Sequence, residues 1–374
     1  MTALEVTPVR SGRDLKAFVE LPWSVYGEDP CWVPPIKRSV AHLLDPKKHP
    51  FWAFSERELF LARRGSETVG RIAAIVDGNH NRYHGERMCA WGFFECRQDP
   101  EAAAGLFSSV ERWAREQGMA FLRGPLNPST NYEIGLLVEG FDTLPALMMP
   151  YNPPYYPEMV FLCGHRKEKD LYAYRFTEDH EIPDWILDQA ERAGRRSGLR
   201  IRGMKADPKG GEEMRLIQQV YRDCWSRNWG FVPMTDKEVT FTIRELVPIF
   251  DPDFAFFLYH GDEAVGLCVI VPDVNPLLKR FNGSLGPAAL VKKFLYASEI
   301  TGLRGLLFGI KEDYRQSGAP YFVLGYLLES LRRRSRYRYL ELGWNLEDNA
   351  AINLLYEEGG GRPAKRYRLY RKNL

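Results

Sequence analysis

Residues 310–370 constrain the fold more than any other part of this chain. A short apolar strand ending at Ile310 runs into a turn that contains Arg315 and Gly318. Leucines then recur at positions i, i+3, i+4 and i+7 of one helical face: Leu324, Leu327, Leu328 and Leu331. This order predicts a strand, a glycine turn and an amphipathic helix that begins at the turn.

The turn has the chemistry of an anion-binding site. A helix N-terminus presents unpaired N–H groups and the positive end of the dipole, which suit a pyrophosphate, and Arg315 adds a charged, forked donor. Pro320 has no N–H, so one donor is missing. The residues predicted to bind the anion are Ile310, Arg315, Gln316, Ser317, Gly318 and Ala319.

A second strand is expected over residues 339–343, followed by Asn349 and a short helix that contains Tyr356. A glycine at 360 and a basic strand complete the segment. A ligand laid beside the first strand would lie within reach of a hydroxyl on the short helix. Tyr356 is the residue positioned to supply that hydroxyl.

This order and spacing resemble the acyl-CoA-binding half of the GCN5-related N-acetyltransferase (GNAT) superfamily. The resemblance implies that Asn349 holds the pantetheine arm and that Tyr356, seven residues later, protonates the departing thiolate. Two residues depart from the usual pattern: Pro320 replaces a donor of a backbone N–H, and Gly361 replaces an aromatic residue.

Composition narrows the class of protein. A chain of 374 residues is too long for one ordinary core and suggests two domains. A net charge of +2 does not indicate the strongly basic surface that nucleic-acid-binding proteins carry. The six cysteines include no CxxC pair and, with the histidines, offer no zinc spacing, so no metal site is expected. Neither a secretory signal nor an apolar run of about 20 residues is present, which favours a cytoplasmic protein.

The predicted elements follow one α/β layout twice. We expect two fused GNAT-like domains, each a central mixed sheet flanked by helices, over residues 1–180 and 181–374. At the place of the anion turn, residues 96–101 of the first domain carry two acids and a proline, which would repel a pyrophosphate. The first domain therefore reads as a degenerate copy, and the second as the acyl-CoA-binding, catalytic one.

Several strings also resemble a bacterial family of tandem GNAT-like acyltransferases, over nearly the whole chain. They lie at residues 32–35, 70–74, 92–95, 124–133, 150–156 and 228–233. Some members resemble the bacterial ceramide synthases, which join a long acyl chain to the amine of a sphingoid base in lipid metabolism. The resemblance thus implies acyl-CoA as co-substrate and an amine as acceptor.

Candidate acceptor-binding residues fall into two groups. Asn131 and Tyr132 lie in a loop rich in proline and asparagine, which forms either an architectural corner or a wall of the acceptor site. The run Trp225, Asn228, Trp229 and Phe231 forms either core or an apolar lid over a lipid tail. Residues 277–281 place apolar side chains beside cations, which supports the lid over a lipid tail. The arginine run at residues 332–338 is either a solvated face or a contact with the CoA 3′-phosphate or an anionic membrane surface, so peripheral membrane contact is an alternative to a wholly cytoplasmic protein.

The predicted chemistry is direct attack of a primary amine on the thioester, without a covalent enzyme intermediate. A carboxylate takes the amine proton, backbone N–H groups near Ile310 polarise the carbonyl, and Tyr356 protonates the thiolate. Asp273 and Glu341 are the candidate bases, and Glu312 is a rival beside the turn. The sequence does not rank them.

Two other functions fit the same fold. One is an aminoacyl transferase built from two GNAT units, which would favour a larger basic face for its tRNA. The other is a binding protein that kept the fold and lost turnover. The two departures from the usual pattern, Pro320 and Gly361, favour this alternative. The sequence specifies neither the acyl length, nor the amine, nor the oligomeric state.

Overall fold

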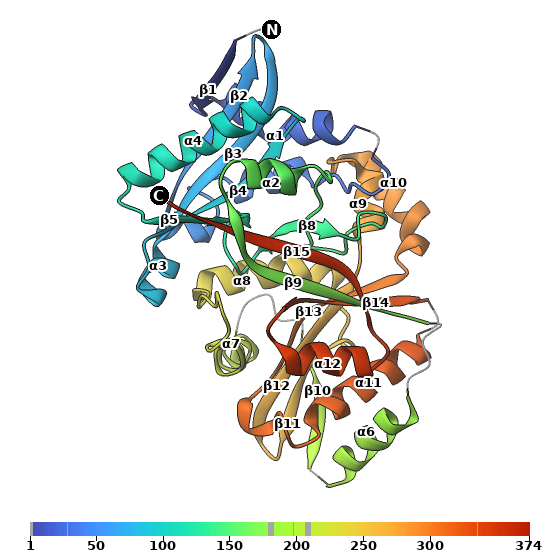
Figure 1. The fold of residues 1–374 in the computed structure, drawn as a ribbon. Helices are drawn as coiled ribbons and strands as arrows, with labels where there is room; N and C mark the ends of the chain where they lie inside the picture. The colour runs from blue at the N-terminus through green and yellow to red at the C-terminus, as the bar shows by residue number, and fades with distance from the viewer. Residues whose placement is uncertain (1–2, 28, 179–182, 197, 206–210, 335) are drawn as a thin grey trace. The chain divides into compact units, whose positions relative to one another are not determined.

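A computed structural model describes residues 3–27, 29–178, 183–196, 198–205, 211–334 and 336–374 (Figure 1). The chain divides into two compact units, each drawn from separate segments. Unit 1 holds residues 1–170, 275–297 and 365–374, and unit 2 holds residues 171–274 and 298–364. The predicted boundary after residue 180 falls outside the described residues and stays a prediction.

Unit 1 is built on a mixed sheet in the order β1-β2-β3-β4-β5-β15, with β8 pairing beside β15. Its strands are β1 (Leu4–Pro8), β2 (Ser55–Arg64), β3 (Glu67–Asp77), β4 (Met88–Cys96), β5 (Phe121–Gly124), β8 (Leu136–Glu139) and most of β15 (Arg362–Asn373), with the small pair β6 (Leu126–Asn127) and β7 (Glu133–Ile134). Its helices are α1 (Gly12–Tyr26), α2 (Lys37–Leu43), η1 (Pro50–Ala53), α3 (Gly78–His84), α4 (Pro100–Glu116), α5 (Tyr156–Leu162), α9 (Asn275–Phe281) and α10 (Pro287–Tyr296).

Local chemistry fixes the ends of several helices in unit 1. α1 begins at a capping box in which Ser11 and Asp14 satisfy each other's backbone N–H groups. α4 begins at Asp99, whose carboxylate accepts the Ala102 N–H at 3.0 Å. Pro100 follows at the first helical position, where its missing N–H costs nothing.

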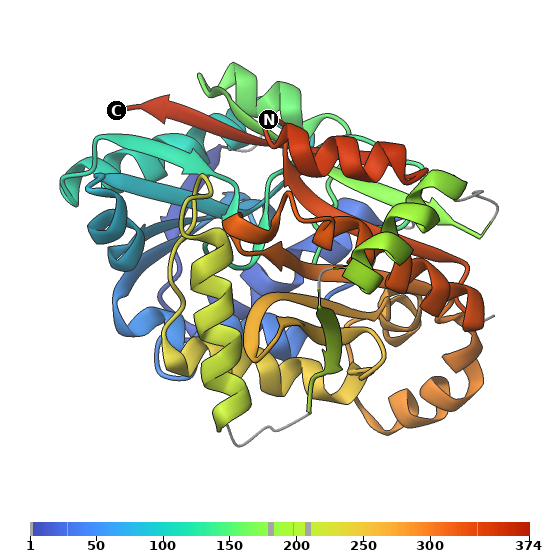
Figure 2. The ribbon, with the colours of Figure 1, turned by 90° about the horizontal axis from the view of Figure 1, so that it is seen from below.

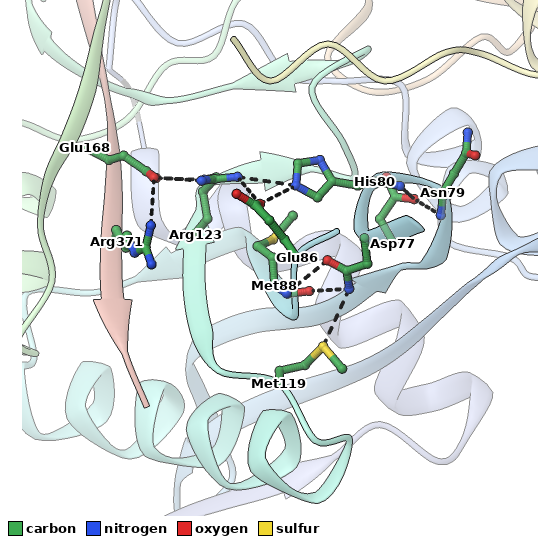
Figure 3. A network of polar contacts seen from close by, with 10 residues as sticks. Asp77, Asn79, His80, Glu86, Met88, Met119, Arg123, Glu168 and Arg371 are labelled. Carbon is green, nitrogen blue, oxygen red and sulfur yellow. Dashed lines mark hydrogen bonds and ion pairs between the residues drawn. The ribbon is translucent and has the colours of Figure 1, made fainter. Parts of the chain in front are cut away.

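A polar network also ties unit 1 together (Figure 3). Arg123 of β5 donates to both carboxylate oxygens of Glu168 at 2.7 Å and to Glu86 at 3.1 Å. Glu86 in turn lies 2.9 Å from Nε2 of His80, and Arg371 of β15 lies 3.7 Å from Glu168. Burial lowers the pKa of His80 to about 4, so this ring is neutral at pH 7 and has a structural role.

Unit 2 carries a sheet in the order β9-β14-β13-β12-β11-β10. Its strands are β9 (Arg166–Thr177, of which residues 171–177 belong to this unit), β10 (Leu199–Gly203), β11 (Ala255–His260), β12 (Glu263–Pro272), β13 (Gly302–Ile310) and β14 (Tyr339–Leu346). Its helices are α6 (Asp184–Arg196), α7 (Glu212–Trp225), α8 (Asp236–Leu246), η2 (Val247–Ile249), η3 (Ala297–Glu299), η4 (Glu312–Tyr314), α11 (Ala319–Arg333) and α12 (Ala350–Glu358).

The two faces of this sheet are covered differently. One core joins Leu324 and Leu328 of α11, Tyr356 of α12 and Ile186 of α6 to strand residues such as Leu342. The other core joins Val220 and Cys224 of α7 to Phe257 and Leu267, with Leu307 of β13 packed against it. Figures 1 and 2 show α11 and α12 (red) on one side of the strands and α7 (yellow) on the other. We call these the α11 face and the α7 face.

Both sequence repeats end in a strand, and the two final strands are exchanged between the compact units. β9, which ends the first repeat, pairs antiparallel with β14 in unit 2. β15, which ends the second repeat, pairs antiparallel with β5 in unit 1. Each sheet is therefore completed by the strand of the other repeat, which explains why the units are discontinuous in sequence.

Candidate functional site

Two parallel strands of unit 2 separate at the centre of the sheet. β13 and β14 are in register from Gly302 with Tyr339 to Gly305 with Leu342, and the pairing stops there. β13 nevertheless runs on to Ile310 beside β12, and β14 runs on to Leu346 beside β9. At the start of the gap, the Arg304 guanidinium donates to the carbonyls of Gly305 and Gly343. Beyond this contact the two strands no longer pair with each other.

A β-bulge lies at the point of separation. Ile270 of β12 opposes Gly305, and the neighbouring Val269 opposes Leu307, so the register skips Leu306. A bulge disrupts the local ladder and turns backbone groups away from it. This feature of β13 could not be predicted from sequence, which pointed only to the strand near Ile310.

The predicted anion turn is formed at the start of α11. Gly318 adopts φ 83°, a left-handed conformation that glycine tolerates, directly before the helix. Among the described residues, the backbone N–H groups of Gln316, Gly318, Ala319 and Tyr321 make no hydrogen bond within the protein. Pro320, between Ala319 and Tyr321, has no N–H to donate. The turn therefore keeps donors for an anion, one fewer than a chain without proline would have.

Arg315, which is predicted to bind the anion, also makes hydrogen bonds within the protein. Its Nε donates to the Ile310 carbonyl at 2.9 Å, and a terminal nitrogen donates to the Cys224 carbonyl at 3.0 Å. The guanidinium thus ties the turn to the end of β13 and to α7. An added Cβ at Gly318 would lie 3.0 Å from the Cβ of Ala193, so this glycine is also needed for packing.

Asn349 directly precedes α12, and Tyr356 lies near the C-terminal end of that helix. Asn349 is the residue before the helix, and its side-chain amide makes no hydrogen bond in the described part of the chain. Tyr356 is buried on the α11 face, where its ring lies 6.4 Å from that of Phe308 and 5.7 Å from that of Tyr174. Phe308 belongs to the part of β13 that has separated from β14.

Burial keeps Tyr356 protonated. Desolvation raises the pKa of its hydroxyl above the usual value for a phenol, and the nearby Cys268 thiol adds to this while Arg304 opposes it. A phenol in this state is a proton donor at neutral pH. Tyr356 lies beside the separated part of β13, and its role as the general acid stays a prediction.

The two candidate bases lie in one polar cluster. Asp273, at the end of β12, accepts a hydrogen bond from the Tyr339 hydroxyl at 2.8 Å. Arg175 of β9 lies over the Tyr339 ring at 4.6 Å and donates to Glu341 at 2.7 Å. We call Asp273, Tyr339, Arg175 and Glu341 the carboxylate cluster. Because Leu340 and Leu342 of β14 face α11, the alternating Tyr339 and Glu341 lie on the α7 face.

Glu341 is the carboxylate with the unusual environment. It is fully buried, and Arg304 occupies the register position beside it on β13. Arg175 binds Oε2, whereas Oε1 is buried without a hydrogen-bond partner in the described part of the chain. Glu312, the third rival, is exposed and pairs with the exposed Arg227 beside the turn. Geometry thus favours the carboxylate cluster over Glu312.

The predicted acceptor residues are divided between the two units. Trp225 packs across Gly309, where an added Cβ would lie 2.2 Å from its ring, and Tyr221 joins it to Phe231 at 5.4 Å. These aromatic rings lie on the α7 face beside the separated part of β13. Asn228 and Trp229 follow α7 in the same segment. Asn131 and Tyr132 belong to unit 1, where Tyr132 stacks edge-on against His49 and Phe51.

The corresponding site in unit 1 is filled by the chain itself. β4 and β5 pair from Met88 with Phe121 to Ala90 with Arg123, and a bulge in β4 follows at residues 93–94. The Phe93 N–H at this bulge donates to the side-chain oxygen of Asn127 at 2.6 Å. At the start of α4, the Asp99 carboxylate takes the place of an anion and pairs with Arg64 at 2.7 Å. Both positions that unit 2 leaves open are thus occupied.

Neither a metal cluster nor a transmembrane helix is present in the described part of the chain. No group of three or more His, Cys, Asp or Glu side chains there could hold a metal ion. None of the helices in these residues is long and apolar enough to cross a membrane.

Comparison with known proteins identifies relatives over the whole length. No protein-family model matches the chain. The bacterial ceramide synthase of Caulobacter vibrioides is 32% identical over 378 residues, which cover 99% of this chain and 98% of that protein. Protein YghO of Escherichia coli is 32% identical over 376 residues, which cover 96% of this chain and 93% of that protein.

Solved structures share the fold at much lower identity. A tandem GNAT protein from the clavulanic acid biosynthesis pathway matches with a TM-score of 0.57 at 12% identity, over 99% of this chain and 98% of its own. A GCN5-related N-acetyltransferase from Sphaerobacter thermophilus matches with a TM-score of 0.54 at 13% identity, over 99% and 95%. The predicted α/β fold of fused GNAT-like domains is confirmed. The chain therefore belongs to the family of tandem GNAT-fold acyltransferases that includes the Caulobacter ceramide synthase and YghO.

Proposed function

We propose that this acyltransferase moves the acyl group of an acyl-CoA thioester onto a primary amine, and that its substrates are a long acyl chain and a sphingoid base. The observation that carries the proposal is the separation of β13 from β14 after Gly305, in the strand that leads to the anion turn and whose Phe308 ring lies 6.4 Å from that of Tyr356. An extended pantetheine chain fits the open strand edges, and the pyrophosphate fits the free N–H groups at the start of α11.

The arrangement supports attack across the sheet. The carboxylate cluster lies on the α7 face, whereas Tyr356 lies on the α11 face. A thioester held between β13 and β14 would have a proton acceptor on one side and a proton donor on the other. We expect backbone N–H groups of β13 between the bulge at Leu306 and Ile310 to polarise its carbonyl.

The proton transfers then follow from the protein's own groups. A primary amine, with a pKa of about 10.4, must lose a proton before it attacks, and Glu341 or Asp273 accepts that proton. The C–N bond forms as the C–S bond breaks, Tyr356 gives its proton to the leaving thiolate, and the new amide nitrogen loses its second proton to solvent. The carboxylate later returns its proton to solvent, and the phenol is reprotonated from solvent.

The substrate class rests on two observations. The relative from Caulobacter bears the name bacterial ceramide synthase. In this chain, the aromatic rings of Tyr221, Trp225 and Phe231 line the α7 face beside the open part of β13, where the amine would arrive. Apolar rings at the acceptor side favour an amine with an apolar tail.

A competition assay tests the proposal. Acyl-CoA donors of 2 to 18 carbons are offered with sphinganine and with spermidine, and the products are measured by mass spectrometry. We expect preference for long donors with sphinganine. Each enclosed methylene contributes about 0.8 kcal/mol, so an enclosed tail would give very large discrimination between acetyl and palmitoyl donors. Preference for acetyl-CoA with spermidine would overturn the lipid substrates and leave the fold and the mechanism standing.

A further inference from the structure

α10 exposes its apolar side chains. Leu290, Val291, Phe294 and Leu295 are 60–87% exposed, and Leu285 just before the helix is 61% exposed. At 100° per residue these four helical positions fall within one face of the helix. The buried residue of α10 is Ala289, which lies nearly opposite that face. The helix therefore rests on a small side chain and turns its large apolar side chains outward, the reverse of an ordinary surface helix.

The segment before α10 is held firmly by unit 1. The Asn282 side chain accepts from the Trp23 indole at 2.8 Å, and the Gly283 carbonyl accepts from the Lys37 N–H at 3.0 Å. Leu277 and Phe281, which the sequence suggested as exposed apolar residues beside cations, are buried. That expectation was wrong for α9, and the exposed apolar face belongs to α10 instead. Figure 1 shows these helices (orange) beside the blue segment that carries α1 and α2.

The charged residues of α9 and α10 are all cations, and the next charged residue along the chain is Glu299 in η3. Residues 275–298 contain four cations and no acidic residue: Lys279, Arg280, Lys292 and Lys293 are the cations. Lys292 and Lys293 lie on the two sides of the apolar face of α10. The Lys292 ammonium donates to the Arg280 carbonyl at 2.7 Å, whereas Lys293 is exposed, where a long cationic side chain can reach a lipid headgroup while the apolar face inserts. Arg280 lies over the Tyr296 ring at 4.8 Å and is kept on the same helix pair.

We propose that α10, with Leu285, binds the surface of a bilayer that contains anionic lipids. The apolar face enters the boundary between headgroups and acyl chains, and the lysines pair with the headgroup phosphates. Apolar side chains in a surface helix alone would fit any apolar partner. The all-positive charge of residues 275–298 is what selects an anionic surface. This inference does not depend on the proposed substrates, because it concerns binding and not turnover.

Vesicle co-sedimentation of the full chain tests it. Vesicles of phosphatidylcholine are compared with vesicles of phosphatidylcholine and phosphatidylglycerol at a ratio of 70:30. We expect binding to the anionic vesicles that falls as salt is raised. The double variant Leu290→Ser/Phe294→Ser should weaken binding about tenfold or more. Lys293→Glu should weaken it about fivefold for each unit of charge lost.

The matched controls use residues of equal exposure elsewhere. Leu162→Ser removes a leucine that is 64% exposed on α5, and it should leave vesicle binding unchanged. Circular dichroism and thermal melting show that each variant folds. Equal binding by wild type and the double variant would overturn the proposal. So would a wild-type dimer in sedimentation velocity that the double variant loses, because the face would then belong to a second copy of the chain.

Discussion

Replacing Glu341 by Gln tests the proposed base directly. The change keeps the size of the side chain and removes its charge and its proton affinity. Glu341 is fully buried, and its ion pair with Arg175 spans 2.7 Å, with 22% of the Arg175 side chain exposed. Breaking a fully buried ion pair typically costs about 3–5 kcal/mol. Because Arg175 keeps some solvent contact and lies over the Tyr339 ring, we expect a loss of about 1–3 kcal/mol in the free energy of unfolding.

The catalytic effect should be much larger than the loss of folded protein. Loss of a general base lowers turnover by about 10²–10⁴-fold. The assay follows release of free CoA thiol with palmitoyl-CoA and sphinganine, well below the melting temperature of the variant. The control is Glu357→Gln on α12, which removes a carboxylate that accepts from the Tyr174 hydroxyl at 2.9 Å on the α11 face. The control should keep its turnover.

Two results would refute the assignment. If folded Glu341→Gln protein keeps wild-type turnover, Glu341 is a structural partner of Arg175 and does not take the amine proton. If Asp273→Asn loses turnover and Glu341→Gln does not, the other carboxylate of the cluster is the base. A loss of activity in Glu341→Gln that only follows its unfolded fraction would also refute a catalytic role.

Three further predictions concern the acid, the anion turn and stability. Tyr356→Phe should lower turnover about 10²-fold with thioester binding nearly unchanged, as measured by titration and steady-state kinetics, and full activity would assign the proton to water. Ser317→Glu should weaken CoA binding, measured by calorimetry, whereas Ser317→Gln should not, because only Glu adds a negative charge beside the phosphates. Equal CoA affinities of the two variants would refute the assignment of this turn as the anion site. Residue 317 is chosen because substitution at Gly318 would also disturb packing. Burial lowers the pKa of His165 to about 3 while the unfolded value is near 6.5, so stability is complete above pH 6.5 and falls as pH drops toward 3. Between pH 7 and 5 the wild-type free energy of unfolding should fall by about 2 kcal/mol more than that of His165→Phe, as measured by denaturant titration. An equal fall in both proteins would contradict this prediction.

Local patterns in the sequence predicted the elements of the site well. The leucine period of α11, the glycine before it and the spacing from Asn349 to Tyr356 all depend on residues within a few turns of one another. Propensity, capping and periodicity act over this range. The backbone of the turn and the position of Tyr356 were therefore predictable from residues 310–370 alone.

Contacts between distant segments were not predictable in the same way. Arg175 and Glu341 are 166 residues apart in sequence and meet because β9 pairs with β14. If the chain is divided into two consecutive domains, the last strand of each repeat is assigned to the sheet of its own repeat. That division does not lead to the pairing of β9 with β14. The outward face of α10 was missed for a related reason, because only the packing of Ala289 shows which side of the helix is buried.

The two repeats differ at the place where, on the proposed mechanism, the thioester binds. In both, the central strand has a bulge just beyond the end of its parallel pairing, at residues 93–94 in β4 and at Leu306 in β13. In unit 1 the bulge N–H of Phe93 is bound by the amide oxygen of Asn127, and a Cβ on Gly92 would lie 1.9 Å from the Leu126 carbonyl oxygen. An amide oxygen is a close chemical stand-in for a thioester carbonyl. The first repeat thus binds its own chain where, on the proposed mechanism, the second repeat binds substrate. On that mechanism, the loop that follows β5 is what separates a structural copy from a catalytic one.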